Sequence, residues 1–450
     1  MSFSKHSMDM TQGPIWSQLA VFALPILLGE VFQQSYSIID SAIVGNYVGD
    51  VALAAVGASD TFTRIIIGFF SGVSVGFTVL VAQAFGRKNK EDLRNAVHTI
   101  ILLSIVLGLM LSIAGVLMID LTLKLMDVPS EVHPLLRGYL KIYFAGISGV
   151  VVYNALTGIL RAVGDSRHPL YYLIGSSLLN IALDYIFVAK LGLGINGAAY
   201  ATILAQMLAA LACLFQMMHV DADWRFSWQG AIDSRVLRAM FTIGFPIGLQ
   251  KSIVQLSNLI VLSHISHFGA ECLAGWVVYS KVSHTLTITA QSITSAETTF
   301  ISQNIGARQL KRAEQGVRDT LLGGLALEGV LIVLVLLFRS PIISIFGAGE
   351  ETTAFASAFL GLILPLQIAH VFMSVYISVL RGGGKALVGT IFMILGLVVT
   401  RQIYLMIIRQ LWYTPMTAGF AYPVGWLTAG ILTYGYYRFR LRTSLYVQTS

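Results

Sequence analysis

Long runs of hydrophobic residues, separated by short polar segments, dominate the chain. The hydrocarbon core of a bilayer is about 30 Å thick, and a helix of about 20 apolar residues crosses it, whereas a transmembrane barrel needs alternating strands of about 10 residues. The pattern therefore predicts an all-α integral membrane protein. We predict twelve transmembrane helices, at residues 16–44, 51–82, 95–120, 136–160, 168–190, 195–219, 237–265, 273–303, 317–338, 354–380, 386–409 and 416–437.

The composition supports a membrane protein. Of the 450 residues, 56% are hydrophobic and 11% are charged, against about 25% charged in an average soluble domain. The formal charge of +7 can indicate nucleic-acid binding, but in a membrane protein it fits basic cytoplasmic loops, so we expect no nucleic-acid partner. Cys213 and Cys272 lie in or beside apolar runs and indicate neither a disulfide framework nor a metal site.

The loops alternate in charge. Those that follow even-numbered spans, together with the C-terminal tail, are rich in arginine and lysine, and the opposite loops hold few basic residues. Since basic loops stay on the cytoplasmic side, we expect both termini in the cytoplasm and the chain in the inner (plasma) membrane.

Three sequence patterns occur twice. FALPILL around Pro25 resembles IGFPIGL around Pro246, VAQAFGRKNKEDLRNA resembles ISQNIGARQLKRAEQG, and GILRAVGD resembles SVLRGGGK, at offsets of 220 or 221 residues. Each half holds six spans, so both halves have the same topology, and an axis along the membrane normal relates them. The sequence thus predicts two pseudo-symmetric six-helix lobes, as in transporters that move two bundles around one site.

The boundaries follow from the longest polar connection. We predict an N-terminal lobe at 1–220, a cytoplasmic linker at 221–236 that tethers the halves, and a C-terminal lobe at 237–450. An ancient duplication without a present role is the alternative explanation of the repeat.

The first span contains unusual residues for a membrane helix. Asp40 is an acid in an apolar run, and Gln33, Tyr36 and Ser37 share its helical face. Pro25 interrupts the helix hydrogen bonds and either bends the helix permanently or allows it to change shape.

More oxygen-bearing side chains occur in the fourth to sixth spans. Asn180 and Asp184 lie one turn apart, Asn154 precedes them and Thr202 follows. Together with Asp40 they can hold a small cation such as Na⁺, or one carboxyl can take up a proton. A structural polar network is the alternative.

The second half does not repeat this acid pair, because Val261 and Tyr404 stand at the matching positions. It carries isolated charges instead, among them Lys281, Glu297 and Arg401. We expect structural ion pairs for these residues; the alternative is a water-filled cavity that receives an anionic group. No complete nucleotide, zinc or nucleophile motif occurs, so we expect no enzyme.

The chain resembles the multidrug and toxic compound extrusion (MATE) transporters, in particular the prokaryotic branch. The resemblance covers essentially the whole length and rests on SIIDSAIVGNYVGDVALAAVGAS, QAFGRKN, QNIGARQ, LRAVGDSRHP, LRGGGK and NIALDYIF, in family order and spacing. It implies export of a substrate driven by inward flow of Na⁺ or H⁺.

The resemblance also implies site residues. The cation or proton site of the first lobe falls on Asp40, Asn180, Asp184 and Thr202, with Asn154 nearby. Other branches have acids in the seventh and tenth spans, where this chain has Gln255 and no acid. We take Pro25, Gln33, Tyr36, Ser37, Asn154, Gln255, Lys281 and Glu297 as candidates for lining the substrate cavity or bending a helix.

We therefore predict a secondary active antiporter that exports small organic molecules (drugs, toxic compounds or metabolites). We expect a monomer in contact with membrane lipids, with no cofactor besides the coupling ion. The alternatives are a flippase for a lipid-linked or polysaccharide precursor, a membrane-embedded enzyme and a passive channel.

Overall fold

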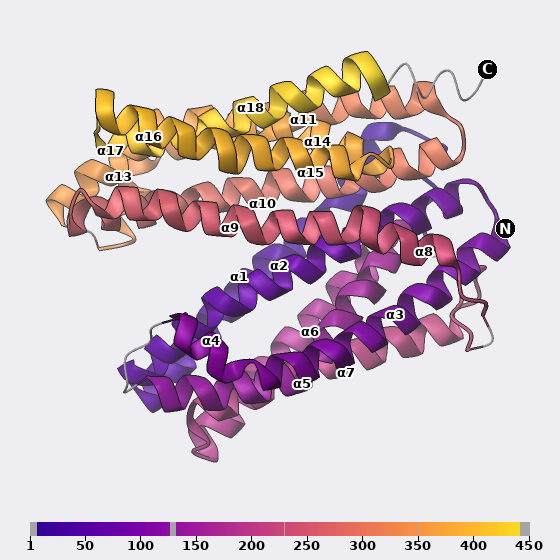
Figure 1. Cartoon of the computed structure of the whole chain (residues 1–450), viewed down its shortest axis with the longest axis horizontal. Coiled ribbons are helices and arrows are strands. Elements are labelled where there is room, and N and C mark those ends of the chain that lie inside the picture. Colours follow the sequence, from indigo (N-terminus) through magenta and orange to yellow (C-terminus); the bar gives the residue numbers. More distant parts are fainter. Residues whose placement is uncertain (1–6, 127–131, 229, 348, 442–450) are drawn as a thin grey trace. The chain divides into compact units, whose positions relative to one another are not determined.

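The computed structural model describes residues 7–126, 132–228, 230–347 and 349–441, and all regular secondary structure within these ranges is helical (Figure 1). The first half contains α1 (Ile15–Val48), α2 (Asp50–Gly86), α3 (Lys90–Leu117), α4 (Ile119–Met126), α5 (His133–Ala162), α6 (Arg167–Asp184), η1 (Tyr185–Lys190), α7 (Gly194–His219), α8 (Ser234–Ala239) and η2 (Met240–Gly244). The second contains α9 (Phe245–Ser266), α10 (Ala270–Gly306), α11 (Leu310–Leu337), α12 (Arg339–Ser344), α13 (Glu350–Leu362), η3 (Leu364–Gln367), α14 (Ile368–Gly382), α15 (Ala386–Ile394), η4 (Leu395–Thr400), α16 (Arg401–Leu411), α17 (Pro415–Gly419), α18 (Ala421–Tyr436) and η5 (Tyr437–Leu441).

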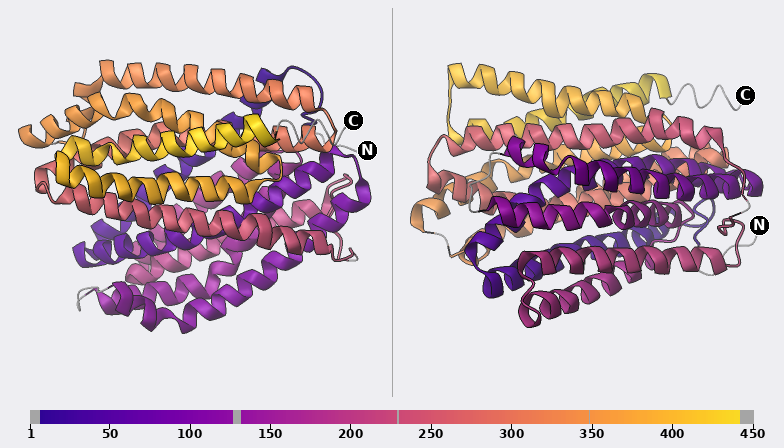
Figure 2. Two further views of the ribbon diagram at one scale, coloured as in Figure 1. Left: turned by 45° about the horizontal axis from the view of Figure 1, so that its top comes forward. Right: turned by 60° about the horizontal axis from the view of Figure 1, so that its bottom comes forward.

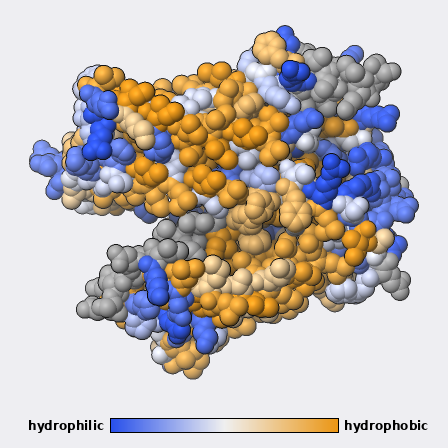
Figure 3. Space-filling view, in the orientation of Figure 1, coloured by the Kyte–Doolittle hydropathy of each residue, from blue (hydrophilic) through white to orange (hydrophobic). Residues whose placement is uncertain are grey.

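Ten helical segments of the described chain are long and apolar enough to cross a membrane. Two of the twelve predicted spans fall outside this set for different reasons. The 37-residue α10 is long enough, but its serines and threonines make it more polar than the other spans. The final predicted span is divided between α17 and α18, and α18 alone has 16 residues. Figure 3 shows apolar residues along the sides of the helices and hydrophilic residues gathered toward their ends.

The contacts divide the chain into two compact units. Unit 1 comprises Leu24–Gly244 with the chain start up to Asp9, and unit 2 comprises Met10–Ala23 and the chain from Phe245 onward. Residues 10–23 thus pack with the second half and residues 237–244 with the first, which differs from the predicted lobe boundaries at 1–220 and 237–450. The chain passes from one unit to the other directly before Pro25 in α1 and directly before Pro246 in α9.

The backbone repeats itself at an offset of 220 residues. The helices α2 and α10 each contain 37 residues, and α3 and α11 each contain 28. Left-handed backbone conformations recur in pairs, with φ of +105° and +106° at Gly49 and Gly269, +56° and +59° at Lys88 and Arg308, and +86° and +73° at Gly164 and Gly384. The repeated sequence patterns therefore encode the same helix ends in both halves.

The ends of α5 and α14 illustrate this. After each helix a glycine with positive φ turns the chain, and the next N–H donates back to a helix carbonyl: Asp165 to Leu160 and Lys385 to Leu380, both at 2.8 Å. This is the hydrogen-bond pattern of a glycine-terminated helix, and it explains why LRAVGD and LRGGGK keep a glycine at this point.

One central helix organises each unit. In unit 1, α5 packs against α2, α3 and α7, and in unit 2, α14 packs against α10, α11 and α18. Figure 2 shows the long helices of each unit running alongside one another. Small residues permit this close approach: a Cβ at Gly146 of α5 would lie 1.9 Å from Cγ2 of Ile203 on α7.

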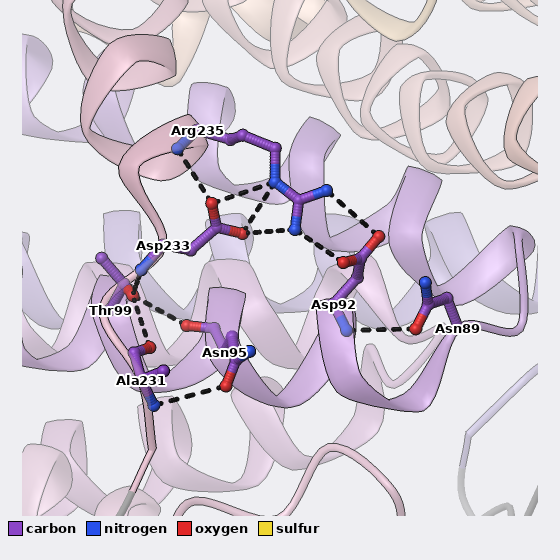
Figure 4. Close-up of polar contacts among 7 residues, drawn as sticks. All are labelled: Asn89, Asp92, Asn95, Thr99, Ala231, Asp233 and Arg235. Carbon is purple, nitrogen blue, oxygen red and sulfur yellow. Dashed lines mark hydrogen bonds and ion pairs between the residues drawn. The ribbon is translucent and has the colours of Figure 1, made fainter.

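The connection between the halves, predicted as a linker at 221–236, packs against unit 1. Trp224 and Phe226 are buried in the core of unit 1 because the segment folds back over the end of α3. Arg235 bridges Asp233 and Asp92 with nitrogen–oxygen distances of 2.9 and 2.6 Å (Figure 4). Predicted linker residues are therefore part of unit 1.

Candidate functional site

A cluster of oxygen-bearing side chains lies within unit 1, where α1, α6 and α7 contribute one or two residues each. The carboxyl groups of Asp40 on α1 and Asp184 on α6 interact electrostatically and are close enough to share a hydrogen bond. Asn180 lies one turn before Asp184, and its Nδ2 donates to Oγ1 of Thr202 on α7 at 3.4 Å. The structure thus brings together the four residues proposed for cation or proton coupling.

This cluster is buried and rich in acceptors. Asp184 is fully buried and Asn180 is 3% exposed, whereas Asp40 and Thr202 are half-buried. Within the described part of the chain, neither carboxyl oxygen of Asp184, nor Oδ1 of Asn180, receives a hydrogen bond from an N–H or hydroxyl donor. Two ionised carboxylates side by side in a poorly hydrated site repel each other strongly. The chemistry of the site therefore fits a bound cation or a shared proton.

The helix changes its geometry directly after Asp184. The turn at Tyr185–Lys190 is a π-helix that continues α6, and Gly197 of α7 packs against Phe187 in this turn. Single π-turns in helices often occur at functional sites because they redirect side chains. The sequence pattern around Asp184 is equally compatible with a regular helix, so this turn was not predicted.

Two further candidates of the first half, Asn154 and Tyr36, lie on α5 and α1. Asn154 bonds within α5, through its Nδ2 to the Val150 carbonyl, and its own carbonyl accepts the Ser74 hydroxyl at 2.7 Å. Tyr36 on α1 interacts electrostatically with Tyr153 of α5.

The remaining candidates on α1 are exposed or half-buried. Gln33 is exposed and Ser37 is half-buried, with the Ser37 carbonyl accepting the hydroxyl of Ser41 at 3.0 Å. Pro25 is half-buried and lies where α1 leaves unit 2 for unit 1. Pro25 therefore lies beside the point where the chain passes from one unit to the other, and it is not part of the acid cluster.

The candidates of the second half differ in their burial. Gln255 on α9 and Lys281 on α10 are exposed. Glu297 is fully buried in α10, where the hydroxyl of Ser378 on α14 donates to its Oε2. Among the described residues, neither Lys281 nor Glu297 has an oppositely charged partner, so the expected ion pairing is wrong for these two residues.

A polar cluster in unit 2 was not recognised in the sequence. Arg401 is 1% exposed, lies over the ring of Tyr422 at 4.4 Å and donates to Oδ1 of Asn258 at 2.7 Å. Its guanidinium is also without an acidic partner among the described residues, which corrects the expected ion pair. The 220-residue offset was the available signal, since it pairs Tyr422 with Thr202 of the acid cluster.

The matching positions of the acid pair also differ, as predicted. Val261 is fully buried, and the Tyr404 hydroxyl donates to the Thr417 carbonyl at 2.9 Å. At this level, unit 1 therefore contains two carboxyl groups, and unit 2 contains a buried guanidinium with neutral polar neighbours.

Comparisons with known proteins identify the family to which this chain belongs. The family model MatE matches two segments of nearly equal length, residues 25–186 and 246–405, which begin at the two paired prolines. The chain is 30% identical over 436 residues to the probable multidrug resistance protein YoeA of Bacillus subtilis, covering 94% of each protein. It is 25% identical over 364 residues to the FAD transporter of Shewanella oneidensis, covering 79% of each.

A solved structure shows the same fold over the whole length. The outward-facing conformation of a multidrug resistance MATE family transporter of the MOP superfamily superposes with a TM-score of 0.91, at 21% identity and covering 99% of each chain. The predicted fold class, with two repeated helical halves, is therefore confirmed.

Proposed function

Because this chain belongs to the MatE family of membrane transporters, we propose that it is a secondary active antiporter that exports small organic molecules in exchange for H⁺ or Na⁺. The observation that carries the proposal is the buried acid pair Asp40–Asp184, with the Asn180 and Thr202 side chains beside it. We place the coupling ion at this cluster. A residue pair of this kind is costly in a membrane unless it has a function or a partner.

In the proposed cycle, uptake of the ion neutralises one of the two charges of the acid pair. This removes the repulsion between Asp40 and Asp184 and allows α1 to pack differently against α6. Pro25 is the point at which α1 bends, since it lacks an N–H and interrupts the helix ladder. Ion and substrate weaken each other's binding, because by thermodynamic linkage the coupling is reciprocal.

The donor set allows both ions. For Na⁺, the carboxylates, Oδ1 of Asn180 and Oγ1 of Thr202 supply the oxygen ligands that a hard cation prefers. For H⁺, one proton between Asp40 and Asp184 leaves one net charge, which the Thr202 hydroxyl can stabilise by donating a hydrogen bond. Replacing Thr202 distinguishes these possibilities by size of effect, because Na⁺ loses a ligand whereas the protonated pair loses one hydrogen bond.

The similarity to a multidrug resistance protein and to an FAD transporter supports organic molecules, including phosphate-bearing ones, as substrates. The basic loops support an inner-membrane location with both termini in the cytoplasm. We further propose that the chain acts as a monomer without an enzymatic activity.

The test is dye efflux from proteoliposomes under a Na⁺ gradient and, separately, a pH gradient. Wild type is compared with Asp40→Asn and with Glu30→Gln, a control that removes a half-buried acid of α1 outside the cluster. We expect efflux under one of the gradients, lost in Asp40→Asn and retained in Glu30→Gln. Unchanged gradient-driven efflux in Asp40→Asn would place coupling elsewhere in the chain.

A further inference from the structure

The exposed face of α10 is polar in the middle of the helix. Lys281, His284, Thr285 and Gln291 are exposed and lie within one face at helical spacing. Lys281 is eleven residues from the start of α10 at Ala270, about 16 Å along the axis at 1.5 Å per residue. This is about half the thickness of the hydrocarbon core, a depth at which a lysine that faces lipid is costly and rare. Contact of this face of α10 with water avoids that cost.

The neighbouring helix α9 contributes at the same depth. A short turn joins α9 to α10, and the two antiparallel helices pack against each other. Gln255 lies eleven residues before the end of α9 at Ser266, as Lys281 lies eleven residues after the start of α10. Gln255 is also exposed. The ammonium group of Lys281 and the amide group of Gln255 are thus exposed at the same distance from the turn that joins α9 and α10.

The buried Arg401 determines how that amide is presented. A guanidinium only donates hydrogen bonds, so Asn258 offers it Oδ1, at 2.7 Å. The Nδ2 of Asn258 then donates to Oε1 of Gln255 at 3.1 Å. The oxygen of Gln255 is consequently engaged, and its Nε2 keeps its two N–H donors for another partner. The chain of bonds makes this exposed side chain a donor.

In the described parts of α9 and α10, acidic side chains do not neutralise the positive charge of Lys281. These described parts contain two acids. Glu271 is in the first turn of α10, ten residues before Lys281, and Glu297 is fully buried and bound by Ser378. Lys281 has no ion pair among the described residues. The face thus combines a positive charge with amide donors.

We propose that this face of unit 2, with Lys281 as its charged residue and Gln255 as an oriented donor, binds a carboxylate or phosphate group of the transported molecule. The proposal rests on the proposed export function and specifies the class of substrate as organic anions or zwitterions. The acid cluster of unit 1 and the donor face of unit 2 then have separate tasks, cation coupling and recognition of the anionic group.

The experiment compares two xanthene dyes in proteoliposomes, the anionic 6-carboxyfluorescein and the cationic rhodamine 123. The variants are Lys281→Gln, Gln255→Glu and, as a control for the loss of one charge, Lys385→Gln, which changes an exposed lysine in the turn after α14. We expect ion-driven export of 6-carboxyfluorescein by wild type and Lys385→Gln. We expect about tenfold slower export by Lys281→Gln and Gln255→Glu, because a charge-assisted contact is lost or opposed.

A second measurement separates binding from transport. Dye anisotropy with detergent-solubilised protein is expected to give an about tenfold higher Kd for 6-carboxyfluorescein in Lys281→Gln. Dye binding is also measured in vesicles made with and without phosphatidylglycerol. A lipid headgroup that occupied the face would compete with the dye, which distinguishes it from the transported molecule.

Three outcomes would overturn the proposal. In the first, wild type exports rhodamine 123 alone; in the second, Lys281→Gln slows both dyes equally or leaves 6-carboxyfluorescein unchanged. In the third, phosphatidylglycerol abolishes dye binding to wild type, which assigns the face to lipid. If neither dye is exported under an ion gradient, the proposed function and the anion site are both contradicted.

Discussion

Replacing Asp184 by asparagine tests the acid cluster with little change in shape. The side chain is fully buried, and its carboxyl group neighbours that of Asp40. Two unit charges about 4 Å apart interact with about 4 kcal/mol at an effective dielectric constant of about 20. A monovalent cation between the carboxylates gains energy of this order from each of them, and dehydration of the ion offsets part of the gain.

Losing one carboxylate should therefore weaken ion binding by at least tenfold, since about 1.4 kcal/mol corresponds to a factor of ten. The assay is the ion concentration at half-maximal efflux, measured for Na⁺ at fixed pH and for H⁺ without Na⁺. Ion-dependent thermal stabilisation of the purified protein gives a second readout that does not need transport.

Glu30→Gln serves as the matched control, because it removes one negative charge from α1 outside the cluster and is expected to leave the half-maximal concentration unchanged. A half-maximal ion concentration in Asp184→Asn within threefold of wild type would refute the assignment of the ion to this cluster. Equal changes in Asp184→Asn and Glu30→Gln would show that net charge, not the site, is responsible.

Three further outcomes follow from the packing and hydrogen bonds. Gly146→Ala should lower the free energy of unfolding by about 1–3 kcal/mol, because the added Cβ would lie 1.9 Å from the Ile203 side chain. A second substitution, Ile203→Ala, should restore part of the loss, and thermal unfolding of the single and double variants checks both expectations. Thr202→Val removes the hydroxyl bonded to Asn180. If this oxygen is a ligand of Na⁺, the variant should bind Na⁺ several-fold more weakly and lose less of its H⁺-driven efflux, and isothermal titration with Na⁺ measures the change in affinity. Arg235→Gln should speed hydrogen exchange in the segment before α8, because the bridge to two aspartates is lost; unchanged exchange would show that Trp224 and its apolar contacts hold the segment alone.

Much of the fold could be predicted because membrane helices are encoded locally. A span needs a run of apolar residues, and the paired sequence patterns revealed the duplication that the backbone repeats at Lys88 and Arg308. The same local rule also predicted the span at 273–303, although α10 is more polar than the other spans and its exposed face carries Lys281.

The acid cluster was foreseeable in part. An acid in a hydrophobic run is conspicuous, so Asp40 and Asp184 could be named from the sequence, as could the shared face of Asn180 and Asp184. Which helices meet is decided by long-range packing, and the π-turn after Asp184 depends on that packing too.

The sequence by itself determined the membrane class, the repeat and the residue types available for coupling, because hydropathy and charge act residue by residue along the chain. Only the tertiary structure decided which polar groups have partners: it buried Glu297 against Ser378 and left Lys281 exposed, although both lie on α10. It also placed Arg401 against Tyr422 and Asn258 instead of an acid. The physical reason is that the cost of a buried charge depends on its neighbours, and neighbours from distant parts of the chain are chosen by the packing of the helices.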